Sequence, residues 1–180
     1  RADMPVSSPI EALRQGVSTY LRGQYEIAVP ALEAANKARD EQPNLRSRLF
    51  FAPFYLARIY SGMHPAYIDH ARAFELYGGM VTRHAFNGPE HVDLTNVSHA
   101  PAVGKAMTEV ARYLMRGVPE ANVAKNKRLA IAYLKHAADV YGEVNAQFEL
   151  ARIDLGSGSA ARTRPALSRL WRLASHHCHA

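Results

Sequence analysis

The sequence predicts an all-α protein, a right-handed α-solenoid of about four helix-turn-helix repeats. Three observations support this prediction. A short motif recurs along the chain at a regular spacing, apolar residues around each copy follow the 3.6-residue period of an amphipathic helix, and the composition is that of one folded domain. Such a protein has a core that neighbouring helical hairpins share, and no β-sheet is expected.

The recurring motif reads Leu-Ala-Arg-Ile-Tyr-Ser-Gly in its second copy and ends in glycine in every copy. Its copies span residues 17–23, where the match is faint, 56–62, 110–117 and 150–156. Gly23 and Gly62, which close the first two copies, lie 39 residues apart, and the same distance separates Gly117 from Gly156. Gly62 and Gly117 are 55 residues apart, because 16 further residues are inserted between them. A period of this length is typical of helical hairpins.

Each copy of the motif marks the end of a first helix, closed by a glycine that can adopt the left-handed capping conformation, and a second amphipathic stretch follows. This second stretch is clearest where Ala130, Tyr133, Leu134, Ala137 and Ala138 share one helical face. The predicted helices span residues 9–22, 24–38, 45–61, 66–83, 100–116, 126–141, 144–155 and 164–176. They pair into repeats at about 9–38, 45–84, 100–141 and 144–176, within a single helical-repeat domain over residues 1–180.

Local signals mark the first helix and the inserted segment. Ser8 can cap the first helix, Pro9 suits its first position, and Glu11 follows the cap by three residues, as a capping box requires. The insertion falls in residues 86–100, where an Asn-Gly-Pro sequence interrupts the helical period. We expect a long loop there, whose role the sequence leaves open.

Composition and charge exclude several classes of protein. With 48 % hydrophobic and 21 % charged residues, the chain is neither disordered nor a disulfide miniprotein, and no apolar run is long enough for membrane insertion. The formal charge of +6 favours an acidic partner, whereas the lack of five consecutive basic residues argues against nucleic acid. The chain begins at Arg1, as it would after removal of an export signal or after a cloning choice. The oligomeric state is left open.

The sequence contains none of the motifs that would indicate an enzyme. Residues 156–159 read Gly-Ser-Gly-Ser, which lacks the Gly-x-Ser-x-Gly spacing of a nucleophile elbow. No glycine-rich phosphate-binding motif is present either. We therefore expect no catalytic residues and no cofactor.

Two groups of histidines contain residue types that bind metal ions. Their members are His84, Glu90, His91 and Asp93 in the insertion, and His176, His177, Cys178 and His179 at the end of the chain. Ligands crowded along a short tail cannot all face one ion, and the insertion is more simply a polar loop. We expect no metal site; a metal ion in the insertion is what an enzymatic function would need.

The second half of the chain matches a known type of repeat. The pattern Ala-x-x-Tyr-Leu-x-x-Ala-Ala at residues 130–138, followed by Gly142, resembles the Sel-one-like branch of the tetratricopeptide (TPR) superfamily. More narrowly, residues 111–119, 130–133 and 145–150 look like the ExoR-type exopolysaccharide regulators of alphaproteobacteria. The resemblance implies that the solenoid consists of Sel-like or TPR-like repeats.

Members of this family are exported to the periplasm, where they restrain a membrane sensor kinase by binding its periplasmic part. The resemblance therefore implies a periplasmic, noncatalytic regulator that inhibits a sensor histidine kinase and so controls exopolysaccharide production through two-component signalling. The alternative is a general adaptor or scaffold for envelope or polysaccharide-synthesis proteins.

Three arginines, Arg58, Arg112 and Arg152, occupy the same position in three copies of the motif. Each follows a small core residue, so stacked hairpins should align the guanidinium groups along a concave wall. There they could bind carboxylates of a protein partner. We add Arg116 and Tyr113, which belong to the same copy as Arg112, to the predicted partner-binding residues.

A structural role for these arginines is the alternative. Each guanidinium group could instead pair with a nearby carboxylate, such as that of Glu109, Glu149 or Asp154. In that case the arginines would only keep the wall hydrated.

Overall fold

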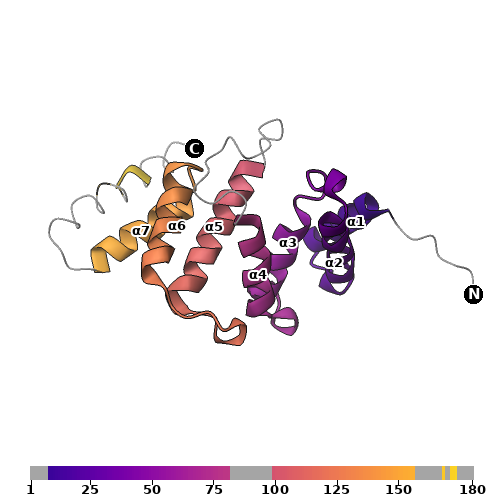
Figure 1. The fold of residues 1–180 in the computed structure, drawn as a ribbon, viewed down its shortest axis with the longest axis horizontal. Coiled ribbons are helices and arrows are strands. Elements are labelled where there is room, and N and C mark those ends of the chain that lie inside the picture. Colours follow the sequence, from indigo (N-terminus) through magenta and orange to yellow (C-terminus); the bar gives the residue numbers. More distant parts are fainter. Residues whose placement is uncertain (1–7, 82–98, 157–167, 169–170, 174–180) are drawn as a thin grey trace, which may run out of the picture. The chain divides into compact units, whose positions relative to one another are not determined.

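The computed structural model describes residues 8–81, 99–156, 168 and 171–173, and the regular elements of this part are helices (Figure 1). Val118 and Val123 add an isolated antiparallel bridge. The all-α prediction is therefore confirmed for the described residues, and helices that are neighbours in sequence pack against each other. The chain divides into two compact units, Arg1–Met80 and Val81–Ala180. The handedness, the repeat count and the single domain stay predictions.

The first unit contains α-helices joined by short 3-10 and π-helical segments. Its elements are α1 (Pro9–Leu21), α2 (Tyr25–Glu41), η1 (Pro43–Leu45), α3 (Ala52–Arg58), η2 (Ile59–Met63), η3 (Pro65–Tyr67) and α4 (His70–Val81), whose last residue passes the boundary between the units. α1 begins as predicted, because Ser8 Oγ accepts a hydrogen bond from the Glu11 amide (3.2 Å) and Pro9 occupies the first turn. α1 packs against α2, and α3 packs against both of them.

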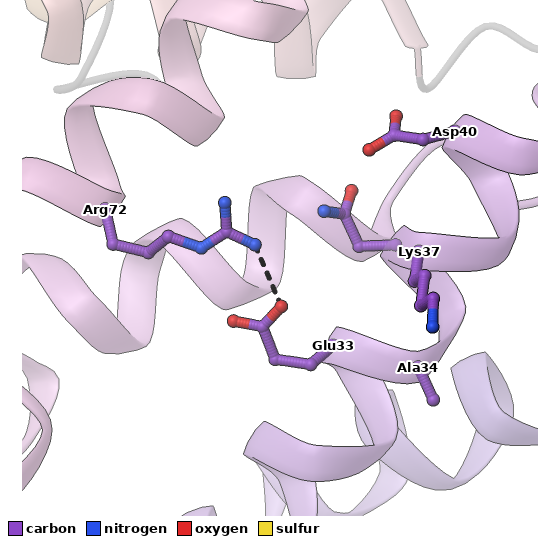
Figure 2. A pocket seen from close by; sticks show the side chains of 6 residues that line it. Glu33, Ala34, Lys37, Asp40 and Arg72 are labelled. Atoms are coloured by element: carbon purple, nitrogen blue, oxygen red, sulfur yellow. Dashed lines mark hydrogen bonds and ion pairs between the residues drawn. The ribbon is translucent and has the colours of Figure 1, made fainter.

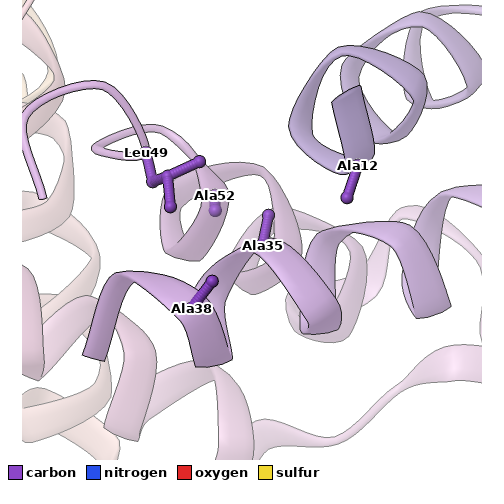
Figure 3. Close-up of a cluster of buried hydrophobic side chains, with 5 residues drawn as sticks. All are labelled: Ala12, Ala35, Ala38, Leu49 and Ala52. Atoms are coloured by element: carbon purple, nitrogen blue, oxygen red, sulfur yellow. The ribbon is translucent and has the colours of Figure 1, made fainter. Parts of the chain in front are cut away.

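Small side chains form a core between the first three helices. Ala12 of α1 and Ala35 and Ala38 of α2 cluster with Ala52 of α3 and with Leu49, which precedes α3 (Figure 3). Because an alanine side chain extends only one carbon from the backbone, helices lined with alanine can approach closely. This part of the core therefore combines closely spaced backbones with larger side chains, those of Leu49 and of the partly buried Ile10, Leu13 and Leu45 that pack against the cluster.

The helix predicted at 45–61 begins later, at Ala52, so its predicted start was wrong. Residues 43–51 form η1 and turns instead. Pro53 favours this later start, since proline fits the first turn of an α-helix without the loss of a hydrogen bond. Pro30 inside α2 shows that a proline alone does not prevent a helix from continuing. α3 starts where Pro53 can occupy its second position.

Other predicted boundaries also differ from the structure; α2, for example, ends at Glu41 rather than at residue 38. α4 begins at His70 rather than at residue 66, because Asp69 caps it by accepting a hydrogen bond from the amide three residues further on (3.0 Å). α5 begins at His99, so the last two residues of the loop predicted at 86–100 are helical. The other residues of that predicted loop lie outside the described part of the chain.

The second unit has three α-helices in its described residues, and they lie side by side (Figure 1). They are α5 (His99–Arg116), α6 (Lys127–Asp139) and α7 (Val144–Gly156), with η5 (Pro119–Ala121) between the first two. α6 packs against both α5 and α7. The predicted inward face of α6 is confirmed at Ala130, Leu134, Ala137 and Ala138, which are buried, while Tyr133 is partly exposed. Of the last predicted helix, 164–176, the structure describes only four residues, of which Leu173 is buried.

The repeated motif shows the same pattern of burial in three copies. Ala57, Ala111 and Ala151 have no exposed surface. The arginine that follows each of these alanines is exposed. The motif therefore assigns one position to the core and the next to the surface, as the sequence predicted. None of the helices in the described ranges is long and apolar enough to cross a membrane.

The left-handed conformation predicted for the glycines that close the motif is present in three copies and absent from the fourth. Gly23, Gly62 and Gly117 have φ angles of 74°, 133° and 79°, in the region that glycine adopts without strain. The prediction was wrong for Gly156, which is the last residue of α7 and has no positive φ. Glycine is permitted in both conformations, so its presence alone does not determine where a helix ends.

Two other glycines permit close contacts between helices. A Cβ atom at Gly16 would lie 2.7 Å from Leu32 Cγ, and one at Gly104 would lie 2.9 Å from Tyr141 Cβ. Both distances are much shorter than an ordinary contact of about 3.5 to 4.0 Å between carbon atoms. Gly16 thereby lets α1 approach α2, and Gly104 lets α5 approach the segment between α6 and α7.

Replacing glycine by alanine should therefore change stability in opposite directions at two positions. Gly16→Ala should lower the free energy of unfolding by about 1 to 3 kcal/mol, because the new methyl group overlaps the buried Leu32 side chain. Gly78→Ala is the matched control in α4. It should raise the free energy of unfolding by about 0.5 to 1 kcal/mol, since nothing lies within 4 Å of the new Cβ. Urea unfolding followed by circular dichroism measures both changes, and effects of the same sign would contradict the close approach of α1 and α2.

Candidate protein-binding surface

Glu149 joins two of the predicted arginines in the second unit. Its Oε1 atom accepts a hydrogen bond from Arg112 Nε (3.3 Å), and its Oε2 atom lies 3.5 Å from Arg152 Nη2. Arg112 also pairs with Glu109 through Nη1. Because Arg112 and Glu109 belong to α5 and the other two residues to α7, these interactions connect the two helices. The structure thus brings Arg112 and Arg152 to the same carboxylate.

The charges of this group are balanced, since two guanidinium groups face two carboxylates. The Glu149 side chain is only 19 % exposed, so its ion pairs are partly shielded from water and salt. Arg112 and Arg152 would have to give up these bonds before they could bind a partner's carboxylate. The geometry therefore favours the structural role for both arginines, in which they pair with carboxylates of their own chain.

Tyr113 lies in the core of the second unit, with 3 % of its surface exposed. The guanidinium carbon of Arg116 stands 4.7 Å from the centre of the Tyr113 ring, within the range of a cation–π interaction. Burial raises the pKa of Tyr113 to about 12, and the positive charge of Arg116 opposes this rise. Tyr113 therefore offers almost no surface to a partner, whereas Arg116 is exposed.

Arg58 lies at the end of α3 in different surroundings. Its guanidinium carbon is 5.7 Å from the centre of the Phe54 ring. Burial raises the pKa of Tyr20, and the positive charge of Arg58 opposes that rise. Among the residues that the structure describes, no carboxylate forms an ion pair with Arg58.

A polar cluster in the first unit was missed by the sequence analysis. Glu33 of α2 binds Arg72 Nη2 of α4 at 2.9 Å (Figure 2). It also accepts a hydrogen bond from Tyr60 Oη (2.8 Å). Arg72 also pairs with Glu75 through Nη1 (3.2 Å). Since Tyr60 belongs to η2, the Glu33 carboxylate connects α2 with both η2 and α4.

The cluster lies beside a hollow of about 420 Å³ that is open to solvent. The hollow is lined by Glu33, Ala34, Asn36, Lys37, Asp40 and Arg72 (Figure 2). Burial raises the pKa of Tyr60 above its ordinary value, and the hydrogen bond to Glu33 and the charge of Glu33 raise it further. The hydrogen bond to Glu33 likewise raises the pKa of Arg72. Glu33 and Arg72 thus pair with each other, and the two acidic and two basic residues that line the hollow balance in charge.

The period of the repeat was the signal that could have revealed this cluster. Glu33 and Arg72 are 39 residues apart, which is one period of the motif. They therefore occupy equivalent positions in successive hairpins, where opposite charges predict an ion pair. Arg112 and Glu149 also form an ion pair, and their separation of 37 residues is close to one period of the motif.

Both histidine groups singled out in the sequence, in the insertion and at the end of the chain, lie outside the described residues. Within the described part of the chain, no group of three or more His, Cys, Asp or Glu side chains could hold a metal ion. No family model, curated protein or solved structure matches this chain. The resemblance to Sel-like repeats and to ExoR-type regulators therefore stays a prediction.

Alkaline conditions should destabilise the protein through Tyr113. Its pKa of about 12 exceeds the ordinary value of 10.0, so the unfolded chain releases this proton before the folded chain does. The stability that Tyr113 contributes is complete below the ordinary pKa and is lost as the pH rises towards the folded value. At about pH 11 the loss should be about 1 kcal/mol. Urea unfolding at neutral and alkaline pH should show a smaller loss for Tyr113→Phe than for the wild type; equal losses would contradict this assignment.

Removing the charge of Glu33 should weaken the first unit. Glu33→Gln should lower the free energy of unfolding by about 1 to 2 kcal/mol, because an amide cannot bind both Tyr60 and Arg72 as a carboxylate does. Glu75→Gln is the matched control. Glu75 pairs with the same guanidinium group, but its side chain is 71 % exposed, so the change should stay below about 0.5 kcal/mol. Equal losses in urea unfolding would mean that the Glu33 pair behaves as an ordinary surface ion pair.

Proposed function

We propose that this chain is a noncatalytic, protein-binding regulator built from TPR-like helical hairpins. The observation that carries the proposal is the repeated register of the motif, in which a fully buried alanine precedes an exposed arginine at 57–58, 111–112 and 151–152. Helical repeats that bind partners combine a constant core position with a surface position in this way. The surface residues can then change without loss of the fold.

The proposed architecture is a right-handed solenoid of about four hairpins, whose first helices line a concave wall. Its support is the packing of helices in the order of the sequence. In the first unit α1 packs against α2 and α2 against α3, and in the second unit α5 packs against α6 and α6 against α7. Stacked hairpins require this order of contacts.

The proposed partner is the periplasmic part of a membrane sensor histidine kinase, which the protein would hold inactive and so control exopolysaccharide production. The support is the resemblance of residues 111–119, 130–133 and 145–150 to the ExoR-type regulators. A periplasmic location follows from the same resemblance. The formal charge of +6 suits an acidic surface on the partner.

Affinity capture from an envelope extract tests the proposal, with the exported full-length chain as bait. A sensor histidine kinase should be captured, and excess untagged protein should release it, because the binding is specific and reversible. Addition of the purified protein should then lower the autophosphorylation of that kinase in proportion to the amount bound.

A helical protein of similar net charge and unrelated sequence serves as the control bait, because it retains only non-specific electrostatic binding. A kinase that binds both baits equally would contradict the proposal. Capture of polysaccharide-synthesis enzymes without a kinase would support the scaffold alternative instead.

A further inference from the structure

The three motif arginines differ in how their charge is balanced. Arg112 and Arg152 share the carboxylate of Glu149, and Arg112 also has Glu109. Arg58 is exposed and forms no ion pair with any described residue. Its charge is therefore available to a ligand without the loss of an existing ion pair.

Arg58 lies near two aromatic side chains. The guanidinium carbon stands 5.7 Å from the centre of the Phe54 ring, one turn earlier on α3, and the positive charge of Arg58 lies close enough to Tyr20, near the end of α1, to oppose the rise that burial causes in the pKa of that side chain. Tyr20 also meets the edge of Tyr55, with 4.8 Å between the ring centroids. A guanidinium group held against rings is weakly hydrated and already oriented, so it loses little solvation and little freedom when it binds.

The series of rings continues to the segment between α3 and α4. The centroid of the Tyr25 ring lies 6.2 Å from the centroid of the Tyr20 ring and also 6.2 Å from that of the His64 ring. The same segment exposes two large apolar side chains, Met63 at 44 % and Ile68 at 49 %. A single cation next to aromatic and apolar surface is typical of protein-binding sites, in which arginine and aromatic residues are enriched.

We propose that Arg58 binds a side-chain carboxylate in an acidic segment of a protein partner, with the partly exposed rings of Tyr25 and Tyr55 contacting apolar residues next to that carboxylate. This inference rests on the proposed protein-binding function and specifies the chemistry of the partner. Arg58 is exposed, and the N–H groups of a guanidinium group can form two parallel bonds to a carboxylate.

The charge of the first unit favours an acidic peptide over a nucleic acid. Arginine beside stacked rings also occurs in sites for single-stranded nucleic acids. Those sites neutralise several phosphates, whereas residues 8–80 contain eight Lys and Arg against seven Asp and Glu. A net charge of +1 over these residues is too small to neutralise a chain of phosphates.

Fluorescence anisotropy with the full chain tests the inference. The probe is a labelled, end-capped peptide in which glutamate and phenylalanine alternate, and the reference peptide has glutamine in place of glutamate. The wild type should bind the glutamate peptide saturably and more weakly at high salt. The glutamine peptide should bind at least about tenfold more weakly, because it lacks the charge that Arg58 recognises.

Variants of the motif arginines provide the decisive comparison. Arg58→Gln should weaken binding of the glutamate peptide at least about tenfold. Arg58→Lys keeps the charge but not the two parallel bonds, so its affinity for the glutamate peptide should be intermediate. If Arg58→Gln does not fold, the affinity of Arg58→Lys tests whether Arg58 binds the peptide. Arg112→Gln is the matched control and should bind within about twofold of the wild type, because Arg112 already has carboxylates of its own.

Several results would overturn the inference. The first two are that both Arg58 variants bind the glutamate peptide as tightly as the wild type does, or that Arg112→Gln loses as much affinity for it as Arg58→Gln. The other two are that the wild type does not bind the peptide saturably, or that it binds a single-stranded oligonucleotide more tightly at the same site. Kinase capture that is unchanged by Arg58→Gln would refute this inference and leave the proposed function standing. Peptide binding that depends on Arg58 without any kinase capture would refute the proposed partner instead.

Discussion

The close approach of paired helices is the constraint on which the rest of this structure depends. Gly16 faces Leu32, and Gly104 faces Tyr141, with no room for a Cβ atom at either contact. Buried alanines line the other contacts, and Ala57 has no exposed surface at all. Small side chains each bury little apolar area, so the stability of the hairpins depends on close packing along the whole length of each helix.

Close packing also decides which polar groups can meet. Glu33 and Arg72 are one repeat period apart and lie on α2 and α4, yet their side chains form an ion pair to which Tyr60 contributes a hydrogen bond. Arg112 of α5 and Glu149 of α7 form a comparable connection in the second unit. Each interaction joins successive hairpins, so the polar contacts support the same helix register that the small residues permit.

The arginine of the motif thus has different interaction partners in different copies. In α5 and α7, Arg112 and Arg152 connect helices through a shared carboxylate. At the end of α3, Arg58 lies near Phe54 and Tyr20 without a carboxylate among the described residues. A repeat protein can vary recognition in this way, because the buried alanine beside each arginine is the same and the core does not change.

The sequence by itself determined the helices, the motif and its exposed arginines, because a hydrophobic period and a recurring motif are local properties of the chain. It mispredicted the start of α3, where Pro53 favours a later start, and the conformation of Gly156, since glycine tolerates both. Only the tertiary structure decided which arginine is balanced by a carboxylate. Arg58 and Arg152 share nearly the same local sequence, but an ion pair requires a separation of a few ångströms, and packing between helices sets that distance.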